Sequence, residues 1–272
     1  DQVRFDLTFQ ILAPDIEIIS PIRDRKLSRE AEIEYLQSHG IPYGWEKAKY
    51  SINRGLWGTS VGGEETLGSE KALPEEAYPT PATQTEPKEL VLGFTRGELT
   101  SLDGQAAPPV ENILKLEKLA APYGIGRDIH VGDTVIGIKG RVGFEAASAL
   151  LTLKAHHLLE KHTLSKWQQF QKDQLANFYG MLLHEGQYLD EAMRNIEAFM
   201  EDSQRYVSGD VVVRLLPYRF ELQGVRSEND LMHPDFGSYG EMNEGWTAAE
   251  AKGFIKILSN PGRIARQVHQ SS

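Results

Sequence analysis

An arginine near the start of the chain is the first residue whose surroundings suggest chemistry. Arg4 and Asp6 stand among Val, Phe and Leu in the stretch DQVRFDLTF. A charged side chain in an apolar segment is costly to bury unless it is paired or binds a ligand. A guanidinium can hold a carboxylate through two parallel hydrogen bonds. Two interpretations therefore stay open: Arg4 forms an ion pair with Asp6 or another carboxylate, or it binds a substrate anion.

Three cations bracket one strand-like segment further along the chain. Arg127, Lys139 and Arg141 flank the stretch RDIHVGDTVIGIKGR. Such a group could bind an anion, or the cations could simply be the solvated ends of a strand, and the pattern does not decide between these.

Two other motifs favour plain structural interpretations. GIGRD at residues 124–128 has glycines typical of a phosphate-binding loop, but it lacks a third glycine and a following helix, so a turn before a strand is favoured. The pair His156-His157 has no partner at a metal-ligand spacing, which favours a solvated or core histidine pair. The pattern predicts neither a catalytic residue nor a metal site.

The first half of the chain must supply the elements that position these residues. Residues 1–13 fit a helix or a strand equally well, residues 17–20 predict a short buried strand, and Ser28 to His39 predicts a helix ending at Gly40. The segment 41–88 is rich in Gly, Pro, Ser and Thr and predicts an irregular loop, which in a compact protein is commonly functional or a boundary.

The second half shows clearer periodicity. We expect a hairpin turned at Arg96-Gly97, a strand-like region over RDIHVGDTVIGIKGR, and two strands around Pro217-Tyr218. Helices are predicted over residues 109–121, 145–161, 164–184, 187–206 and 247–269, the last interrupted by Pro261.

Composition limits the possible function classes. The chain has 272 residues, no cysteine and a net charge of −10. An acidic chain lacks the basic footprint that nucleic-acid binding needs. No apolar run reaches the roughly 18 residues of a membrane helix. The absence of cysteine excludes disulfides and thiolate chemistry and fits a cytoplasmic protein.

A series of longer motifs resembles the argininosuccinate synthase family. DQVRFDL, LAPDIEIISPIRD, SREAEIEYLQSHGIP, KYSINRGLWG, YGIGRDIHVGDTVIGIKGR, FEAASALL and AEAKGFIKI match it in the same order over essentially the whole chain. The resemblance implies an α+β protein: the C-terminal part of an α/β nucleotide-binding domain at 1–43, a larger α+β synthetase domain with a mixed sheet at 44–246, and a C-terminal helical oligomerisation arm at 247–272.

The resemblance also implies a reaction. In the family, a cytoplasmic homotetramer of arginine biosynthesis joins citrulline to aspartate while ATP, with Mg2+, is cleaved to AMP and pyrophosphate. By resemblance, Asp1 matches an aspartate-binding acid and Arg4 a citrulline-binding arginine. Ser51 and Ser60 match two serines that hydrogen-bond citrulline.

Two positions depart from the family pattern. Gly132 and Phe144 stand where the family has a glutamate and a tyrosine that contact citrulline. Without that glutamate the ammonium of citrulline loses its partner, and the glycine is expected to leave open space. The substrate is therefore either plain citrulline, with Asp133 or a water taking over, or a citrulline whose α-amino group is acylated.

One family motif does not occur in these residues. The ATP-phosphate loop SGGxDxS is absent from the sequence, so the 272 residues alone are expected to be inactive and the longer parent chain active. The alternative hypothesis is a non-catalytic binding or oligomerisation module without a nucleotide domain.

Overall fold

The computed structural model describes residues 2–41, 49–232, 240 and 245–270. The chain divides into two compact units, residues 1–229 and 230–272. The first unit begins with three helices, α1 (Gln2–Leu12), α2 (Pro21–Arg25) and α3 (Arg29–Ser38). The hydroxyl of Ser28 accepts a hydrogen bond from the backbone N–H of Ala31 at 3.3 Å and so caps α3 as its sequence predicts.

The strand expected at residues 17–20 is wrong. These residues form no strand, and Ile19 is 77% exposed. An apolar run becomes a strand only where a neighbouring strand satisfies its backbone hydrogen bonds, and no described strand pairs with this segment.

A first antiparallel sheet, called sheet A, contains four strands in the order β1-β2-β7-β6. Its strands are β1 (Ser51–Gly55), β2 (Gly58–Gly62), β6 (Arg127–Asp133) and β7 (Lys139–Glu145). The prediction of an irregular loop over 41–88 is therefore wrong in part. Residues 51–62 form a hairpin, which is followed by α4 (Glu64–Leu67) and η2 (Glu75–Ala77). One face of sheet A packs on a small apolar cluster formed by Val61, Leu73 and Ala77.

A second antiparallel sheet, sheet B, has the order β5-β4-β3-β8-β9. Its strands are β3 (Lys88–Thr95), β4 (Glu98–Leu102), β5 (Gln105–Ala106), β8 (Gly209–Leu216) and β9 (Arg219–Arg226). The hairpin at Arg96-Gly97 is confirmed, and both residues have positive φ, 50° and 83°. The mixed sheet expected from the resemblance is replaced by two separate sheets in which every described strand pair is antiparallel.

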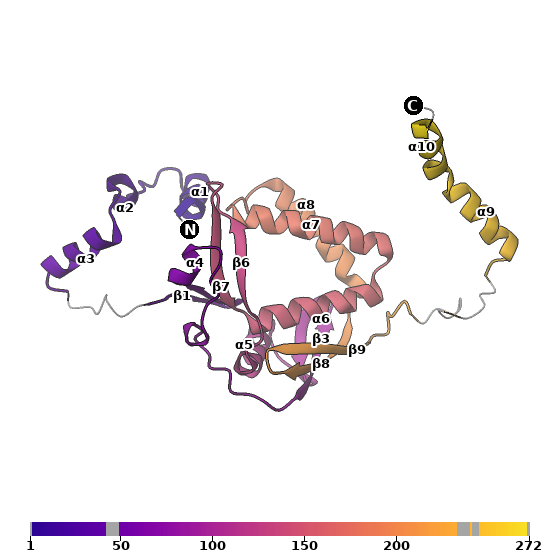
Figure 1. Ribbon diagram of the computed structural model, residues 1–272, viewed down its shortest axis with the longest axis horizontal. Helices are drawn as coiled ribbons and strands as arrows, with labels where there is room; N and C mark the ends of the chain where they lie inside the picture. Colours follow the sequence, from indigo (N-terminus) through magenta and orange to yellow (C-terminus); the bar gives the residue numbers. More distant parts are fainter. Residues whose placement is uncertain (1, 42–48, 233–239, 241–244, 271–272) are drawn as a thin grey trace. The chain divides into compact units, whose positions relative to one another are not determined.

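Helices cover sheet B and form the main core with it. α5 (Pro109–Ala120) contacts β4, and α6 (Ala147–Thr163) contacts β3, β8 and β9 (Figure 1). Leu and Val side chains of the strands meet Leu116 of α5 and Leu151 and Leu159 of α6, all fully buried. α6 continues directly from β7, so this one helix links the two sheets. η3 (Ala121–Tyr123) ends α5.

Two more helices complete the first unit. α7 (Lys166–His184) and α8 (Glu191–Ser203) pack against each other, and η4 (Gln204–Tyr206) leads from them into β8 (Figure 1). The helices expected at 145–161, 164–184 and 187–206 are thereby confirmed within a few residues at each end.

The second unit contains two amphipathic helices. α9 (Ala248–Leu258) starts with Thr247 and Glu250 in a reciprocal capping box, and α10 (Asn260–Gln270) follows a break just before Pro261. Their large apolar side chains are exposed: Phe254, Ile255, Ile257, Leu258, Ile264 and Val268. No described helix is both long and apolar enough to cross a membrane. The fold class is confirmed as α+β with C-terminal helices.

Candidate functional site

Four of the residues predicted to bind substrate share one face of sheet A. Strand pairing places Ser51 opposite Gly62, and Ser60 opposite Phe144. Phe144 in turn lies opposite Asp128 of β6. Alternate residues of a strand point the same way, so Asp128 and Gly132, four residues apart, lie on the same face of β6. Since the opposite face packs on the Val61 cluster, the face carrying Ser51, Ser60, Gly132 and Phe144 is the open one.

Three polar residues on this open face were missed from the sequence. Asn53 lies opposite Ser60, Asp128 lies opposite Phe144, and His130 follows Asp128 on the same side. The ring of His130 meets the ring of Phe144 edge-on, with centroids 6.3 Å apart. Counting back from Gly132 in steps of two would have found both Asp128 and His130.

His130 corrects the expectation that Gly132 faces empty space. A Cβ added to Gly132 would lie 2.6 Å from Nε2 of His130, so the imidazole leans along β6 over the glycine. Side chains at i and i+2 of a strand are neighbours, and the lack of a Cβ at Gly132 lets the ring of His130 occupy that place.

Arg4 lies on α1 and reaches the end of another helix. Its Nη1 donates a hydrogen bond to the backbone oxygen of His184 at 3.1 Å, at the C-terminus of α7, where a positive charge is favourable. Asp6 forms an ion pair with Arg23 of α2. The predicted site residue Asp1 lies outside the described residues.

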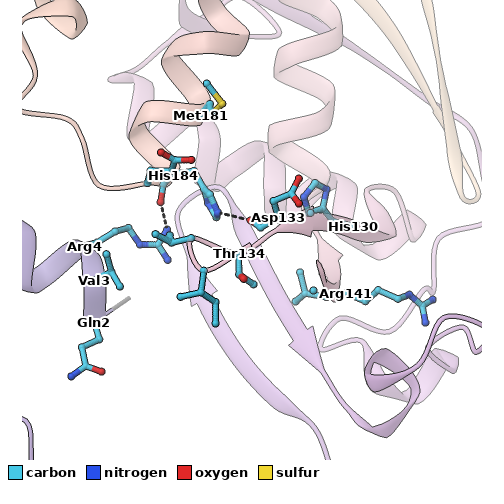
Figure 2. Close-up of a pocket in the computed structure, with 15 residues that line it drawn as sticks. Gln2, Val3, Arg4, His130, Asp133, Thr134, Arg141, Met181 and His184 are labelled. Carbon is cyan, nitrogen blue, oxygen red and sulfur yellow. Dashed lines mark hydrogen bonds between the residues drawn. The ribbon is translucent and has the colours of Figure 1, made fainter. Parts of the chain in front are cut away.

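Arg4 and Gly132 line one pocket of about 890 Å³. Figure 2 shows Arg4, His184 and Asp133 joined across it by two hydrogen bonds, the second being that of His184 Nε2 to the backbone oxygen of Asp133 at 3.2 Å. The pocket lies between α1, the β6–β7 turn and the C-terminus of α7. Ser51, Ser60 and Phe144 lie elsewhere on the open face of sheet A and are not among its described lining residues.

Both carboxylates among the described lining residues of the pocket have a hydrogen-bond or ion-pair partner. Asp133 Oδ1 lies 2.5 Å from Nζ of Lys139, its partner in the β6–β7 register. Glu185 accepts a hydrogen bond from the side-chain amide of Gln187 at 2.8 Å. Asp133 follows Gly132 directly and so points to the other face of β6, although both residues line the pocket.

The basic group Arg127, Lys139 and Arg141 serves the fold. The side chain of Arg127 is only 6% exposed; it pairs with Glu75 and with buried Glu145, and stacks on the ring of Tyr78. Arg141 donates hydrogen bonds to backbone oxygens of the segment after β2, at 3.2 Å to Glu65 and 3.0 Å to Lys71. Because Lys139 pairs with Asp133, each of the three cations already has an acceptor.

GIGRD is a turn, as expected. Gly126 has φ of 78°, and a Cβ there would lie 2.5 Å from the backbone carbon of Ala146. The glycine is therefore needed where the start of β6 crosses the β7–α6 junction.

The histidine pair borders a buried charge cluster. His156 Nε2 lies 2.9 Å from Oε1 of Gln204, and burial lowers the pKa of His156. His157, Glu160 and Asp173 bring three possible metal ligands within 4.8 Å of one another. The ammonium of Lys172 lies among them, 2.5 Å from Glu160 and 2.8 Å from Asp173, and supplies the cation that these carboxylates need.

Comparison with known families assigns the chain. The family model described as "Arginosuccinate synthase C-terminal domain" matches residues 50–265, and the one described as "Arginosuccinate synthase N-terminal HUP domain" matches residues 1–42. The chain belongs to the argininosuccinate synthase family.

Curated members of the argininosuccinate synthase family match nearly the whole chain. The argininosuccinate synthase of Dictyoglomus thermophilum is 36% identical over 95% of this chain and 65% of its own length. That of Xanthomonas campestris is 36% identical over 99% of this chain and 69% of its own length. That of Methanocaldococcus jannaschii is 35% identical over 89% of this chain and 62% of its own length. The chain thus spans about two thirds of the length of these argininosuccinate synthases.

Proposed function

We propose that this chain is part of an argininosuccinate synthase-type ligase of arginine biosynthesis. The reaction joins the ureido carbon of citrulline, or of an N-acylated citrulline, to the amine of aspartate and cleaves ATP to AMP and pyrophosphate. The observation that carries the proposal is the match of residues 50–265 to the family's C-terminal domain. The gathering of Ser51, Ser60, Gly132 and Phe144 on one open sheet face supports it.

Each site residue has a role in this proposal. Arg4 binds the α-carboxylate of the citrulline-type substrate, because a guanidinium fits a carboxylate with two hydrogen bonds. Ser51 and Ser60 offer hydroxyl groups that can donate to or accept from that substrate. Asp1 holds the ammonium of aspartate, and Phe144 forms an apolar surface beside the ureido chain.

The chemistry has two steps. The ureido oxygen attacks the α-phosphorus of ATP, and pyrophosphate leaves. The amine of aspartate, after losing a proton to solvent, then attacks the activated carbon and expels AMP. The chain's own residues bind and orient the amino-acid substrate, and orientation alone can contribute much of the rate.

ATP is a substrate in this proposal, and Mg2+ is expected with its phosphates. The cluster of His157, Glu160 and Asp173 does not fit Mg2+, because the ammonium of Lys172 lies among its ligand atoms. No step is assigned to that cluster. The phosphates are proposed to bind to a segment outside these 272 residues, since the motif SGGxDxS does not occur in them.

We propose three domains, with the nucleotide domain ending at residue 43, the synthetase domain at 44–246 and an oligomerisation arm at 247–272. We further propose that the protein is a homotetramer, and the exposed apolar side chains of α9 and α10 support self-association. The absence of cysteine supports a cytoplasmic location.

The test measures pyrophosphate release from ATP, aspartate and a citrulline-type substrate. We expect turnover by the protein encoded by the complete reading frame and none by the 272 residues alone. Inactivity of the complete protein with citrulline and with acylated citrullines would contradict the proposal. It would favour the alternative, a non-catalytic binding or oligomerisation module. A start codon directly upstream of Asp1 would do the same.

A further inference from the structure

The walls of the pocket beside Gly132 are apolar on three sides. Val3 comes from α1, Val135 and Ile136 from the β6–β7 turn, and Met181 from α7. All four side chains are substantially exposed, at 45% to 74% of their surface. Apolar groups that converge on an open pocket gain free energy when an apolar ligand group covers them.

The polar groups of the pocket can hold a carboxylate and a carbonyl oxygen. Arg4 brings a permanent positive charge, and His130 and His184 bring imidazoles. Of the two described carboxylates, Asp133 pairs with Lys139, whereas Glu185 keeps its charge and accepts a hydrogen bond from the neutral amide of Gln187. On β6, the carboxylate next to Gly132 is that of Asp133, and it already pairs with Lys139. An ammonium ion placed over Gly132 would therefore lose water and compete with Lys139 for this carboxylate, which is a costly exchange.

The floor of the pocket is formed by paired glycines. Gly132 of β6 lies opposite Gly140 of β7, and a Cβ on Gly140 would meet only Cγ2 of Thr134, at 3.6 Å. A ligand can therefore approach the backbone closely at Gly140. The ring of His130 covers Gly132 beside it and can donate a hydrogen bond to a carbonyl oxygen of the ligand.

We propose that this pocket is a subsite for a short, uncharged acyl group on the α-nitrogen of the citrulline-type substrate. The α-carboxylate then pairs with Arg4, the amide carbonyl faces His130, and the acyl chain lies against Val135, Ile136 and Met181. This inference rests on the proposed function, since it names the substrate of the same site. Acylation removes the positive charge that would otherwise compete with Lys139 for Asp133.

The first experiment compares kcat/KM of the complete enzyme for citrulline, N-acetylcitrulline and N-butyrylcitrulline, with pyrophosphate release as the readout. We expect N-acetylcitrulline to exceed citrulline at least tenfold. Each further methylene of the acyl chain that becomes buried should then raise kcat/KM by up to about fourfold. This factor corresponds to a transfer free energy of roughly 0.8 kcal/mol per methylene, with about 1.4 kcal/mol for each tenfold change.

A matched pair of variants tests where the acyl chain lies. Met181→Trp fills the pocket and should remove the advantage of N-butyrylcitrulline over N-acetylcitrulline. Leu183→Trp, on the same helix with similar exposure but outside the pocket lining, should keep that advantage. Equal thermal stability of both variants and of the wild type shows that the comparison is fair. Loss of the advantage in both variants, or in neither, would overturn the placement.

The outcomes separate this inference from the proposed function. Turnover with citrulline in clear preference to both acylated forms would overturn the inference and leave the proposed function intact. If Glu185→Gln selectively abolishes the use of free citrulline, Glu185 is the ammonium partner and the inference is likewise wrong. Absence of turnover with all three compounds would contradict the proposed function itself.

Discussion

Replacing Lys172 by methionine should strongly destabilise the protein, because it leaves a buried carboxylate without its cation. The side chain of Glu160 is 1% exposed, and its Oε2 lies 2.5 Å from Nζ of Lys172. Burial alone would lower the pKa of Lys172, but hydrogen bonds to Asp173 and Glu160 raise it overall, so the lysine is charged. Removing one partner of a buried ion pair costs about 3–5 kcal/mol.

The remaining contacts of Glu160 place the expected cost at the low end of this range. Nε2 of Gln204 still donates to its Oε1 at 3.0 Å, and His157 Nδ1 lies 3.4 Å from Oε2. We therefore expect a loss of about 3 kcal/mol, or roughly 6–12 °C in Tm for a unit of this size. Urea and thermal unfolding followed by circular dichroism at neutral pH measure it.

Two further variants make this test decisive. Lys154→Met changes an exposed lysine on the same helix as Glu160 and should cost less than about 0.5 kcal/mol. The double variant Glu160→Gln with Lys172→Met removes both charges and should regain at least half of the loss. If Lys172→Met is no more destabilising than Lys154→Met, the cluster does not contribute as a buried ion pair.

Three other predictions follow from the structure. Burial lowers the pKa of His156, so on acidification the unfolded state takes up this proton before the folded state does. The free energy of unfolding should therefore fall as pH drops below about 6.5 and level off below the pKa of the folded state. His156→Gln should flatten this slope in unfolding curves measured at several pH values. Arg4→Lys keeps the charge but loses the bidentate hydrogen bond to a carboxylate. The KM for the citrulline-type substrate should therefore rise at least tenfold while the KM for ATP stays the same. Equal changes in both KM values would contradict a substrate-binding role for Arg4. Deletion of residues 253–272 removes the exposed apolar side chains of α9 and α10 and should lower the particle mass in light scattering, whereas an unchanged mass would argue against an oligomerisation arm.

Elements with strong periodicity could be predicted from the sequence alone. The helices α5 to α8 and the hairpin at Arg96-Gly97 follow from apolar spacing and turn residues. The hairpin 51–62 could not be found this way, because its strands are short, rich in glycine and serine, and open to solvent on one face. The opposite error occurred at residues 17–20, where an apolar run has no partner among the described strands.

The candidate site was only partly visible in the sequence. Resemblance named Ser51, Ser60 and Phe144, but only the strand register shows that they share a face. His130 was missed because a single histidine in a strand has no spacing signal of its own, and only its offset of two residues from Gly132 places it on the same face. The basic residue Arg127 looked available for an anion, since its carboxylate partner Glu75 lies far away in the sequence and cannot be inferred from periodicity.

The pairing of β2 with β7 has a consequence for the order of folding. Sheet A is built from two local hairpins, and the pairs that join them, such as Ser60 with Phe144, connect segments separated by β3, β4, β5 and α5. Hairpins close within microseconds, whereas pairing across a long loop must first overcome its closure entropy. Amide protons of the β1–β2 and β6–β7 ladders should therefore gain protection from exchange early during refolding. Those between β2 and β7 should follow later, so that the surface on which substrate is proposed to bind is assembled only after each of its halves exists.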